Sequence, residues 1–479
     1  MIVSASHYWL KNAHVPHRLL SPNILANLGL NEVHGAYIHD ETSGDGLVVM
    51  DIEINQGLIQ SVQSSSQSPE HSTVEATPRE DAELQSILAL DLRHKQVWPG
   101  FVDMHTHLDK GHIWERTPNR DRTFAGALEA CDRDMVHWTP EDLYQRMNFG
   151  LKCSYAHGTV ALRTHLDAIR PIGHDSFEVF QTLQREWGDR LTLQAVCLTT
   201  LDSFLGAAGE ALADLVACTP GGVLGGVAFP SDDMDTELDR VFAMAKERHL
   251  DLDFHVDESG NPHHNGLRHI ARAALRHQFE GRITCGHCCS LAVQPPSEVR
   301  QTIAMVKEAG IGIVSLPLCN LYLQDREQSA SANLMQMGLA VREQLATGRT
   351  PRWRGVTLLH ELNEAGVEVA IANDNCRDPF HGFGDHDMLE VFNLSARIAH
   401  LDHPYFQWVK TVTSTPAQLM GLSNMGVIEV GQPANLVIFQ ARTFSELLSR
   451  PQGDRIVLRN GKEISTTLPS YEELDDLFF

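Results

Sequence analysis

Apolar runs of strand length alternate with amphipathic helical patterns through the middle of this chain. The runs are rich in Val, Ile and Leu, which suits parallel strands that helices cover on both faces. Between them, segments such as "TELDRVFAMAKERH" and "NGLRHIARAALRHQ" repeat apolar residues at helical spacing. Eight such units are the number that closes a (β/α)8 barrel of the TIM type. The eight expected strands are "GFVDMHTHLD", "TVALRTHLD", "LTLQAVCLTT", "VLGGVAFP", "LDLDFHVDE", "RITCGHCCS", "IGIVSLPL" and "VEVAIANDN".

The two ends of the chain have a different pattern from the middle. Short segments in which apolar and polar residues alternate are separated by tight turns. "GLVVMDIEINQGLIQSV" alternates around a Gly turn as a hairpin does, and "RIVLRNGKEIS" contains an Asn-Gly turn. We therefore expect residues 1–96 and 425–479 to form one small β-sandwich domain, built from both chain termini, around a barrel at 97–424. The polar stretch around residues 61–87 is rich in Ser, Glu and Pro, which is typical of a solvated loop.

Two prolines mark expected boundaries. Pro99-Gly100 interrupts an apolar run and should mark the crossing from the β domain to the barrel. After the eighth strand, "TSTPAQLMG" predicts one more helix, with Thr415 as N-cap and Pro416 at the first helical position.

Composition narrows the class of protein. The 479 residues suffice for a barrel with a satellite domain, and 42% hydrophobic with 21% charged residues is an ordinary globular balance. A net charge of −24 would repel nucleic acid and anionic lipid, so we expect neither as a partner. The sequence has no signal-peptide pattern and no apolar stretch that could span a bilayer. We therefore expect a cytoplasmic protein whose nine cysteines are small core residues.

Polar, ligand-capable side chains gather at the expected carboxyl ends of the strands, where barrel enzymes place their active sites. The first strand ends in His105 and His107, and their i, i+2 spacing puts both on one face. His255 ends the fifth strand and Asp374 the eighth. These four side chains can hold one divalent ion and leave room for a water molecule. Nitrogen and oxygen donors without thiolate fit Zn²⁺ or Fe²⁺, and the sequence does not choose between them.

Each of these residues also has an ordinary explanation when it is taken alone. With 26 histidines, an H-x-H pair arises easily by chance, and His255 could be a satisfied core histidine. Asp374 could be a helix N-cap. The metal hypothesis rests on their joint occurrence at the same end of three different strands.

The motifs around these residues carry a resemblance. "PGFVDMHTHLD", then "HVDES", "GHCCS" and "NDNCRDPF", and finally "GVIEVGQPANLVIF" resemble the amidohydrolase superfamily, and within it the cytosine deaminase branch. The likeness extends from about residue 90 to residue 464. It implies a (β/α)8 barrel with a small β-sandwich. Many members hold two metals bridged by a carboxylated lysine on strand four, and "VLGGVAFP" has no lysine, which favours a single metal.

The resemblance also implies catalytic roles. Glu258, three residues after His255, matches the glutamate that passes a proton to the ring nitrogen of the substrate. His287 matches the histidine that polarises or orients the attacking water. Asp374 would bind the metal and also accept the proton of that water. Hydroxide would attack an electrophilic ring carbon, and the amine would leave from a tetrahedral intermediate.

Three positions depart from the cytosine deaminases. Thr200 lies near the position where the family has a glutamine that hydrogen-bonds the substrate ring. Asn375 stands where the family has a second aspartate, directly after the metal-binding aspartate, and Phe380 stands where it has a tryptophan. Threonine lacks the reach and the paired donor and acceptor of glutamine. Sites that hydrogen-bond a substrate discriminate steeply against mismatched analogues. We therefore expect cytosine to be a poor substrate.

Further residues are candidates for lining the pocket. Lys110 follows "HTHLD", where the family has a small polar residue, and it could bind a substrate carboxylate or carbonyl or be a solvated loop lysine. Asp109 is expected to orient a metal histidine. Three more candidates lie near strand ends: Trp114, His165 and Asn320.

The leading hypothesis is a metal-dependent hydrolytic deaminase of an amino-substituted nitrogen heterocycle or cyclic amidine. A second hypothesis keeps the same hydroxide as the nucleophile but has another group leave, as in N-alkyl aminotriazine dealkylation or cyclic amide opening. A third is a non-catalytic scaffold of the same fold. The family resemblance also suggests a homo-oligomer.

Overall fold

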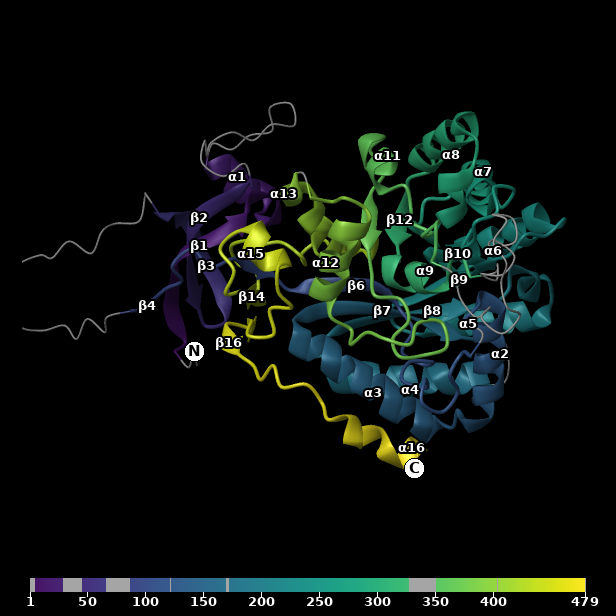
Figure 1. Cartoon of the computed structure of the whole chain (residues 1–479), viewed down its shortest axis with the longest axis horizontal. Helices are drawn as coiled ribbons and strands as arrows, with labels where there is room; N and C mark the ends of the chain where they lie inside the picture. The colour runs from purple at the N-terminus through teal and green to yellow at the C-terminus, as the bar shows by residue number, and fades with distance from the viewer. Residues whose placement is uncertain are drawn as a thin grey trace, which may run out of the picture.

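All eight expected strands are present and follow one another around a barrel in chain order (Figure 1). The computed structural model describes residues 5–28, 45–65, 87–120, 122–168, 172–326, 350–402 and 404–478. The pairs are parallel and their side chains are mostly buried, as continuous apolar runs require. The strands are β6 (Phe101–Thr106), β7 (Thr159–Asp167), β8 (Thr192–Leu198), β9 (Gly222–Ala228), β10 (Leu252–Val256), β11 (Ile283–His287), β12 (Ile311–Ser315) and β13 (Val369–Ile371).

Polar groups close the barrel between its last strand and its first. The backbone N–H of Asp374 donates to the carbonyl of His105 at 2.8 Å, and the Thr106 hydroxyl donates to the Asp374 carbonyl at 2.9 Å. Below them, the buried Asp103 carboxylate accepts from the backbone N–H of Asn373 at 3.2 Å and from its amide Nδ2 at 2.9 Å. The closure therefore fixes Asp374 directly beside the end of β6.

Helices surround the barrel, and the two helical segments quoted from the sequence, "TELDRVFAMAKERH" and "NGLRHIARAALRHQ", are confirmed as α6 and α7. Thr139 caps α3 through its hydroxyl, Pro140 is the first helical residue, and Gly158 ends the helix at φ 104°. An additional helix, α2, lies between β6 and α3. The helices that follow the strands are α2 (Phe124–Asp134), α3 (Pro140–His157), α4 (Ile172–Trp187), α5 (Ala207–Cys218), α6 (Met234–Arg248), α7 (Gly266–His277), α8 (Pro296–Glu308), α9 (Pro317–Leu323), α11 (Leu359–Glu364) and α12 (Met388–Ile398).

The helix expected at "TSTPAQLMG" is present as α14 (Ser414–Leu419), but its predicted start is wrong. Its N-cap is Thr413, two residues before Thr415, and no side chain caps the first turn. A 3₁₀ turn at Val409–Val412 leads directly into the helix, and the Thr413 hydroxyl donates back to the Val409 carbonyl at 2.8 Å. The preceding turn therefore sets the start of α14.

Two four-stranded sheets at one end of the barrel combine both ends of the chain (Figure 1). The first contains β1 (His7–Pro16), β2 (Leu47–Asn55), β3 (Leu58–Ser64) and β4 (Leu88–Asp91). The second joins β5 (Val97–Pro99) to β14 (Leu436–Ile438), β15 (Ile456–Arg459) and β16 (Lys462–Glu463). Leu436 and Ile438 pack into the core of these sheets, whereas Val437 between them packs into the barrel core. Pairing with β14 extends the small sheet through Pro99, so the chain crosses to the barrel at Pro99-Gly100.

The described part of the chain bears on two other expectations. All nine cysteines are unpaired and eight of them are buried, as core thiols are. None of the helices in the described ranges is long and apolar enough to cross a membrane. Most of the polar stretch around residues 61–87 lies outside the described residues.

Candidate active site

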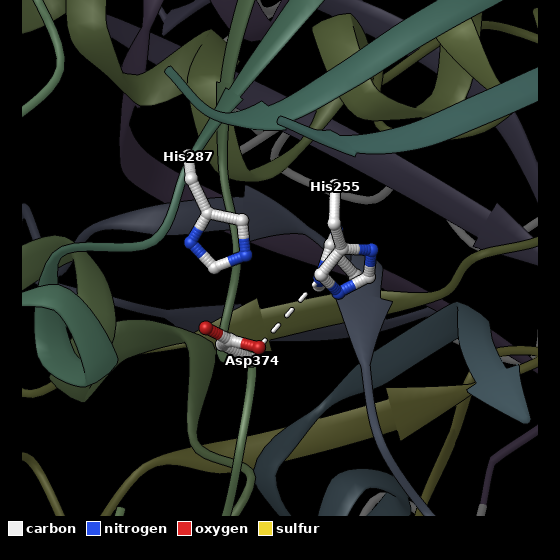
Figure 2. A group of neighbouring side chains, drawn as sticks. His255, His287 and Asp374 are labelled. Carbon is white, nitrogen blue, oxygen red and sulfur yellow. Dashed lines mark hydrogen bonds and ion pairs between the residues drawn. The ribbon is translucent and has the colours of Figure 1, made fainter. Parts of the chain in front are cut away.

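Four ligand-capable atoms converge at the carboxyl ends of the barrel strands. His105 is the last residue but one of β6 and His107 follows that strand, His255 lies on β10, and Asp374 follows β13. His255 Nε2 lies 3.1 Å from His105 Nε2 and 3.2 Å from His107 Nε2. Asp374 Oδ1 lies 3.3 Å from His107 Nε2 and 3.6 Å from His105 Nε2. Figure 2 shows His255 and His287 extending from neighbouring strands toward the Asp374 carboxylate.

This spacing fits one small divalent cation. A regular tetrahedron with edges of about 3.3 Å has its centre about 2.0 Å from each corner, close to the usual Zn–N distance. Among the described residues, neither oxygen of Asp374 has a hydrogen-bond partner. Burial raises the pKa of Asp374 to about 8. A cation held by these four atoms would favour the ionised form of this carboxyl group.

The three histidines are held neutral, which is the form that binds metals. Burial, and then the charges of neighbouring imidazoles, hold the pKa values of His105 and His255 well below their usual range. For His107 the causes are burial and then the Lys110 ammonium. The described residues thus include buried histidine and aspartate groups able to bind a divalent metal.

His165 lies beneath this cluster. Its ring is 3.9 Å from the His105 ring, centroid to centroid, and its Nε2 lies 3.3 Å from Oδ1 of the buried Asp253. Arg163 donates to the other oxygen of Asp253 at 2.8 Å. His165 is fully buried and does not line the cavity described below, so its expected contact with substrate stays a prediction.

Glu258 and His287 lie next to the cluster, and Asn320 on α9 connects them. The Asn320 amide Nδ2 donates to Glu258 Oε1 at 3.1 Å and lies 3.0 Å from His287 Nδ1. Because Nδ2 only donates, His287 Nδ1 accepts and its proton is assigned to Nε2. His287 Nε2 has no partner among the described residues, and burial lowers the pKa of His287 to about 3. His287 is thus a neutral N–H donor beside Asp374.

The Glu258 carboxyl group is suited to hold a proton. Burial, and then the charge of Asp374, raise the pKa of Glu258 well above its ordinary value, against the opposing effect of the Asn320 hydrogen bond. A carboxyl group with a raised pKa can serve as a general acid near neutral pH.

A cavity of about 240 Å³ opens above these groups. Its wall is mostly apolar and comes from α2 and from the segments after β9 and β13. Phe124 contacts Phe380 edge to face at 5.7 Å and Phe229 at 6.4 Å between centroids. Phe229 is 41% exposed and Leu128 is 43% exposed, and both line the cavity. No pattern in the sequence indicated that α2 would cover the site.

Lys110 lines this cavity but is not a solvated loop residue. It is 4% exposed, and its Nζ donates to Asp167 Oδ1 at 2.7 Å. Burial lowers the pKa of Lys110, but the Asp167 and Asp109 carboxylates outweigh burial and raise it. Asp167, the last residue of the second expected strand, is a site residue that the sequence analysis missed, although its strand-end position was a signal.

Asp109 does not orient a metal histidine among the described contacts. Its Oδ2 accepts instead from the backbone N–H of Asp167 at 2.6 Å, and burial, followed by the charge of Asp167, raises the pKa of Asp109 to about 7. Its Oδ2 thus faces β7, and the expected contact with a metal histidine stays a prediction. Asp109 supports the loop that carries Lys110.

The other expected substrate-binding residues fall into two groups. Thr200, Asn375 and Phe380 line the cavity. Asn375 Nδ2 donates to Asp378 at 2.7 Å, and the Thr200 hydroxyl lies 3.1 Å from that of Ser203. Trp114 packs against Tyr322 at 6.3 Å and, like Asn320, is outside the cavity lining. Contact of any of these side chains with substrate stays a prediction.

Fold and site together define a barrel protein with buried His and Asp groups able to bind a metal ion at the carboxyl ends of its strands. The chain belongs to the amidohydrolase family, whose profile matches residues 156–463, and the resemblance read from the sequence is confirmed. Pterin deaminase of Rhizobium rhizogenes is 46% identical over 434 residues, which cover 90% of this chain and 92% of that protein. N-isopropylammelide isopropyl amidohydrolase of Pseudomonas sp. is 25% identical over 385 residues, 78% of this chain and 87% of that protein.

The fold is also similar to a solved structure. 5-Methylcytosine deaminase from Klebsiella pneumoniae superposes with a TM-score of 0.73 and 21% identity, covering 97% of this chain and 98% of that one. This similarity confirms a (β/α)8 barrel with a small β domain.

The cation site makes a prediction about metal content. Asp374→Asn removes the one anionic ligand, and we expect it to weaken binding by about 100-fold or more. After gel filtration, mass spectrometry of the elements should find one equivalent of metal per chain less than in the wild type. Asp103→Asn, a buried aspartate at the same strand junction, should keep the wild-type content. Equal metal content in wild type and Asp374→Asn would show that the cluster holds no ion.

Proposed function

We propose that this protein is a metal-dependent hydrolytic deaminase of an amino-substituted nitrogen heterocycle, and that its substrate class is the pterins, 2-amino-4-oxopteridines. The observation that carries the proposal is the placement of Glu258 and His287 beside the His/Asp cluster, at the base of an aromatic cavity. The 46% identity to a pterin deaminase supports the choice of substrate class.

His105, His107, His255 and Asp374 hold a single cation in this proposal, Zn²⁺ or Fe²⁺, in accord with the 3.1–3.6 Å separations between their ligand atoms. Such an ion lowers the pKa of water and supplies hydroxide near neutral pH. The described stretch of β9, Gly222–Ala228, contains no lysine that could bridge a second ion, which supports one metal in this cluster.

The reaction adds water across the C=N bond of the amino-bearing ring carbon and expels ammonia. Glu258 delivers its proton to the ring nitrogen as the new C–O bond forms. The Nε2–H of His287 donates to the incoming oxygen, which gains negative charge at the tetrahedral stage. Asp374 accepts the proton of the attacking water and returns it to the leaving amine. As the carbonyl forms, the hydroxyl proton of the tetrahedral intermediate passes back to Glu258. The carbonyl product and ammonia then account for all atoms of substrate and water, and both carboxyl groups return to their starting state.

The cavity suits a fused bicyclic ring better than a single ring. Phe124, Phe229 and Phe380 offer aromatic surface above the cluster, where the second ring of a pterin would lie. A single pyrimidine ring leaves this surface in contact with water. Thr200 lacks the amide of the glutamine it replaces. Both features work against cytosine.

The same cluster could instead release an alkylamine, as the name of the Pseudomonas relative indicates for that protein. The apolar side chains of Leu128 and Met135 at the cavity would accept an N-alkyl group. We further expect a cytoplasmic homo-oligomer with neither nucleic acid nor membrane as a partner, in accord with the net charge of −24.

A substrate panel tests the proposed reaction. We expect purified protein supplied with Zn²⁺ or Fe²⁺ to release ammonia from pterin, with kcat/KM about 100-fold or more above that for cytosine, because the mismatched ring leaves polar groups unpaired. Ammonia and alkylamine are measured separately, with N-isopropylammelide as the comparison substrate. Isopropylamine release without ammonia from pterin would establish the alternative reaction, and efficient cytosine turnover would refute the predicted selectivity.

The role of Glu258 can be tested by one isosteric change. Glu258→Gln removes the proton that the ring nitrogen needs, so we expect kcat to fall by about 10²–10⁴-fold while the metal content stays unchanged. Glu237→Gln is the matched control, because Glu237 is a buried glutamate on α6 that accepts from Ser231, outside the site. Full activity of Glu258→Gln would rule out this proton donor.

A further inference from the structure

A second group of metal-ligating side chains lies outside the site described above. His112 follows the β6 strand end, and Cys376 and His386 belong to the segment between β13 and α12. One ligand atom of each residue lies within 4.8 Å of the other two. All three side chains are buried, with 2% exposure for His112 and Cys376 and none for His386. Imidazole with thiol is a donor set typical of zinc sites.

The imidazole nitrogens of this group have no hydrogen-bond partner among the described residues. Both ring nitrogens of His112 and both of His386 lack a hydrogen bond among the described residues. A buried polar group without a partner destabilises the fold, and native structures contain few of them. Four such atoms in one place indicate that a small species outside the chain satisfies them.

Helix α3 closes one side of the group and supplies no partner. The Phe149 ring packs edge-on against His112, 4.8 Å between centroids. At Gly150 an added Cβ would lie 3.0 Å from His386 Nε2, so there is no room there for a side chain that could donate or accept. The partner must therefore come from the space between the three side chains.

The arrangement of the two imidazoles matches that of the first cluster. The centroids of His112 and His386 are 5.4 Å apart, within the 4.5–5.5 Å found among His105, His107 and His255. His112 and His386 also have positive φ angles, 62° and 55°, which L residues rarely adopt. Both residues thus hold an uncommon backbone conformation, and their rings are tilted by 47° to each other.

We propose that His112, Cys376 and His386 bind a second transition-metal ion of the zinc class, with a structural role. On binding, the Cys376 thiol loses its proton to solvent, the thiolate and one nitrogen of each imidazole become ligands, and a water completes the coordination. The ion connects two segments that already contact each other, because the backbone N–H of His112 donates to the Cys376 carbonyl at 3.0 Å. His112 lies five residues after His107, and Cys376 lies two residues after Asp374. Both His107 and Asp374 are ligands in the first cluster. The second ion would hold those ligands in register whatever reaction the first cluster performs.

Cobalt distinguishes the two sites, because only the second contains sulfur. The full chain is produced in minimal medium with Co²⁺ as the added transition metal and purified by gel filtration. We expect two equivalents of cobalt per chain and a thiolate-to-cobalt charge-transfer band in the near ultraviolet. One equivalent and no such band in the wild type would overturn the proposal, without recourse to any variant.

Variants then assign the band. Cys376→Ser should lose the band and one equivalent, whereas Asp374→Asn should lose the other equivalent and keep the band. Cys319→Ser is the matched control, since Cys319 is a buried thiol 3.6 Å from Asn375 Oδ1, near the first cluster. Loss of the band in Cys319→Ser with retention in Cys376→Ser would also contradict the proposal.

Discussion

The convergence of three imidazole nitrogens and one carboxylate oxygen in a buried volume is the constraint on which the site depends. The four separations that join these atoms in turn, 3.1–3.6 Å, leave no space for a water molecule between those pairs. An unpaired carboxylate in such a place costs several kcal/mol, which a bound cation offsets. The barrel makes this convergence possible, because the closure between β13 and β6 places Asp374 beside His105.

Around this cluster, the residues suited to proton transfer and the residues suited to substrate binding form separate groups. The polar groups Glu258, His287 and Asn320 form one hydrogen-bonded unit at the base of the cavity, and the aromatic side chains of Phe124, Phe229 and Phe380 form its upper wall. Asn320 fixes the tautomer of His287 and at the same time holds Glu258 in place. The hydrogen-bonded unit at the floor of the cavity is suited to proton transfer, and the aromatic wall is suited to binding a flat ring. A change of substrate within the family can therefore arise from changes in the aromatic wall alone.

Much of this architecture follows from the sequence, because continuous apolar runs and strand-end polar residues are local signals. They predicted the eight strands and brought His105, His107, His255 and Asp374 to one place. Contacts between segments that are distant in the chain have no comparable signal in the local sequence. The pairing of β5 with β14, the ion pair of Lys110 with Asp167, and the cover that α2 gives to the cavity all depend on tertiary packing. The start of α14 was misplaced because a 3₁₀ turn precedes it, and sequence alone does not distinguish such a turn from a cap.

The central claim is that the four converging atoms hold a catalytic metal ion, and anomalous diffraction tests it most directly. Crystals of the active protein, measured on either side of the absorption edge of the metal it contains, should give a peak about 2.0–2.2 Å from the Nε2 atoms of His105, His107 and His255 and from Asp374 Oδ1. Active crystals with no anomalous peak between these four atoms would contradict the account.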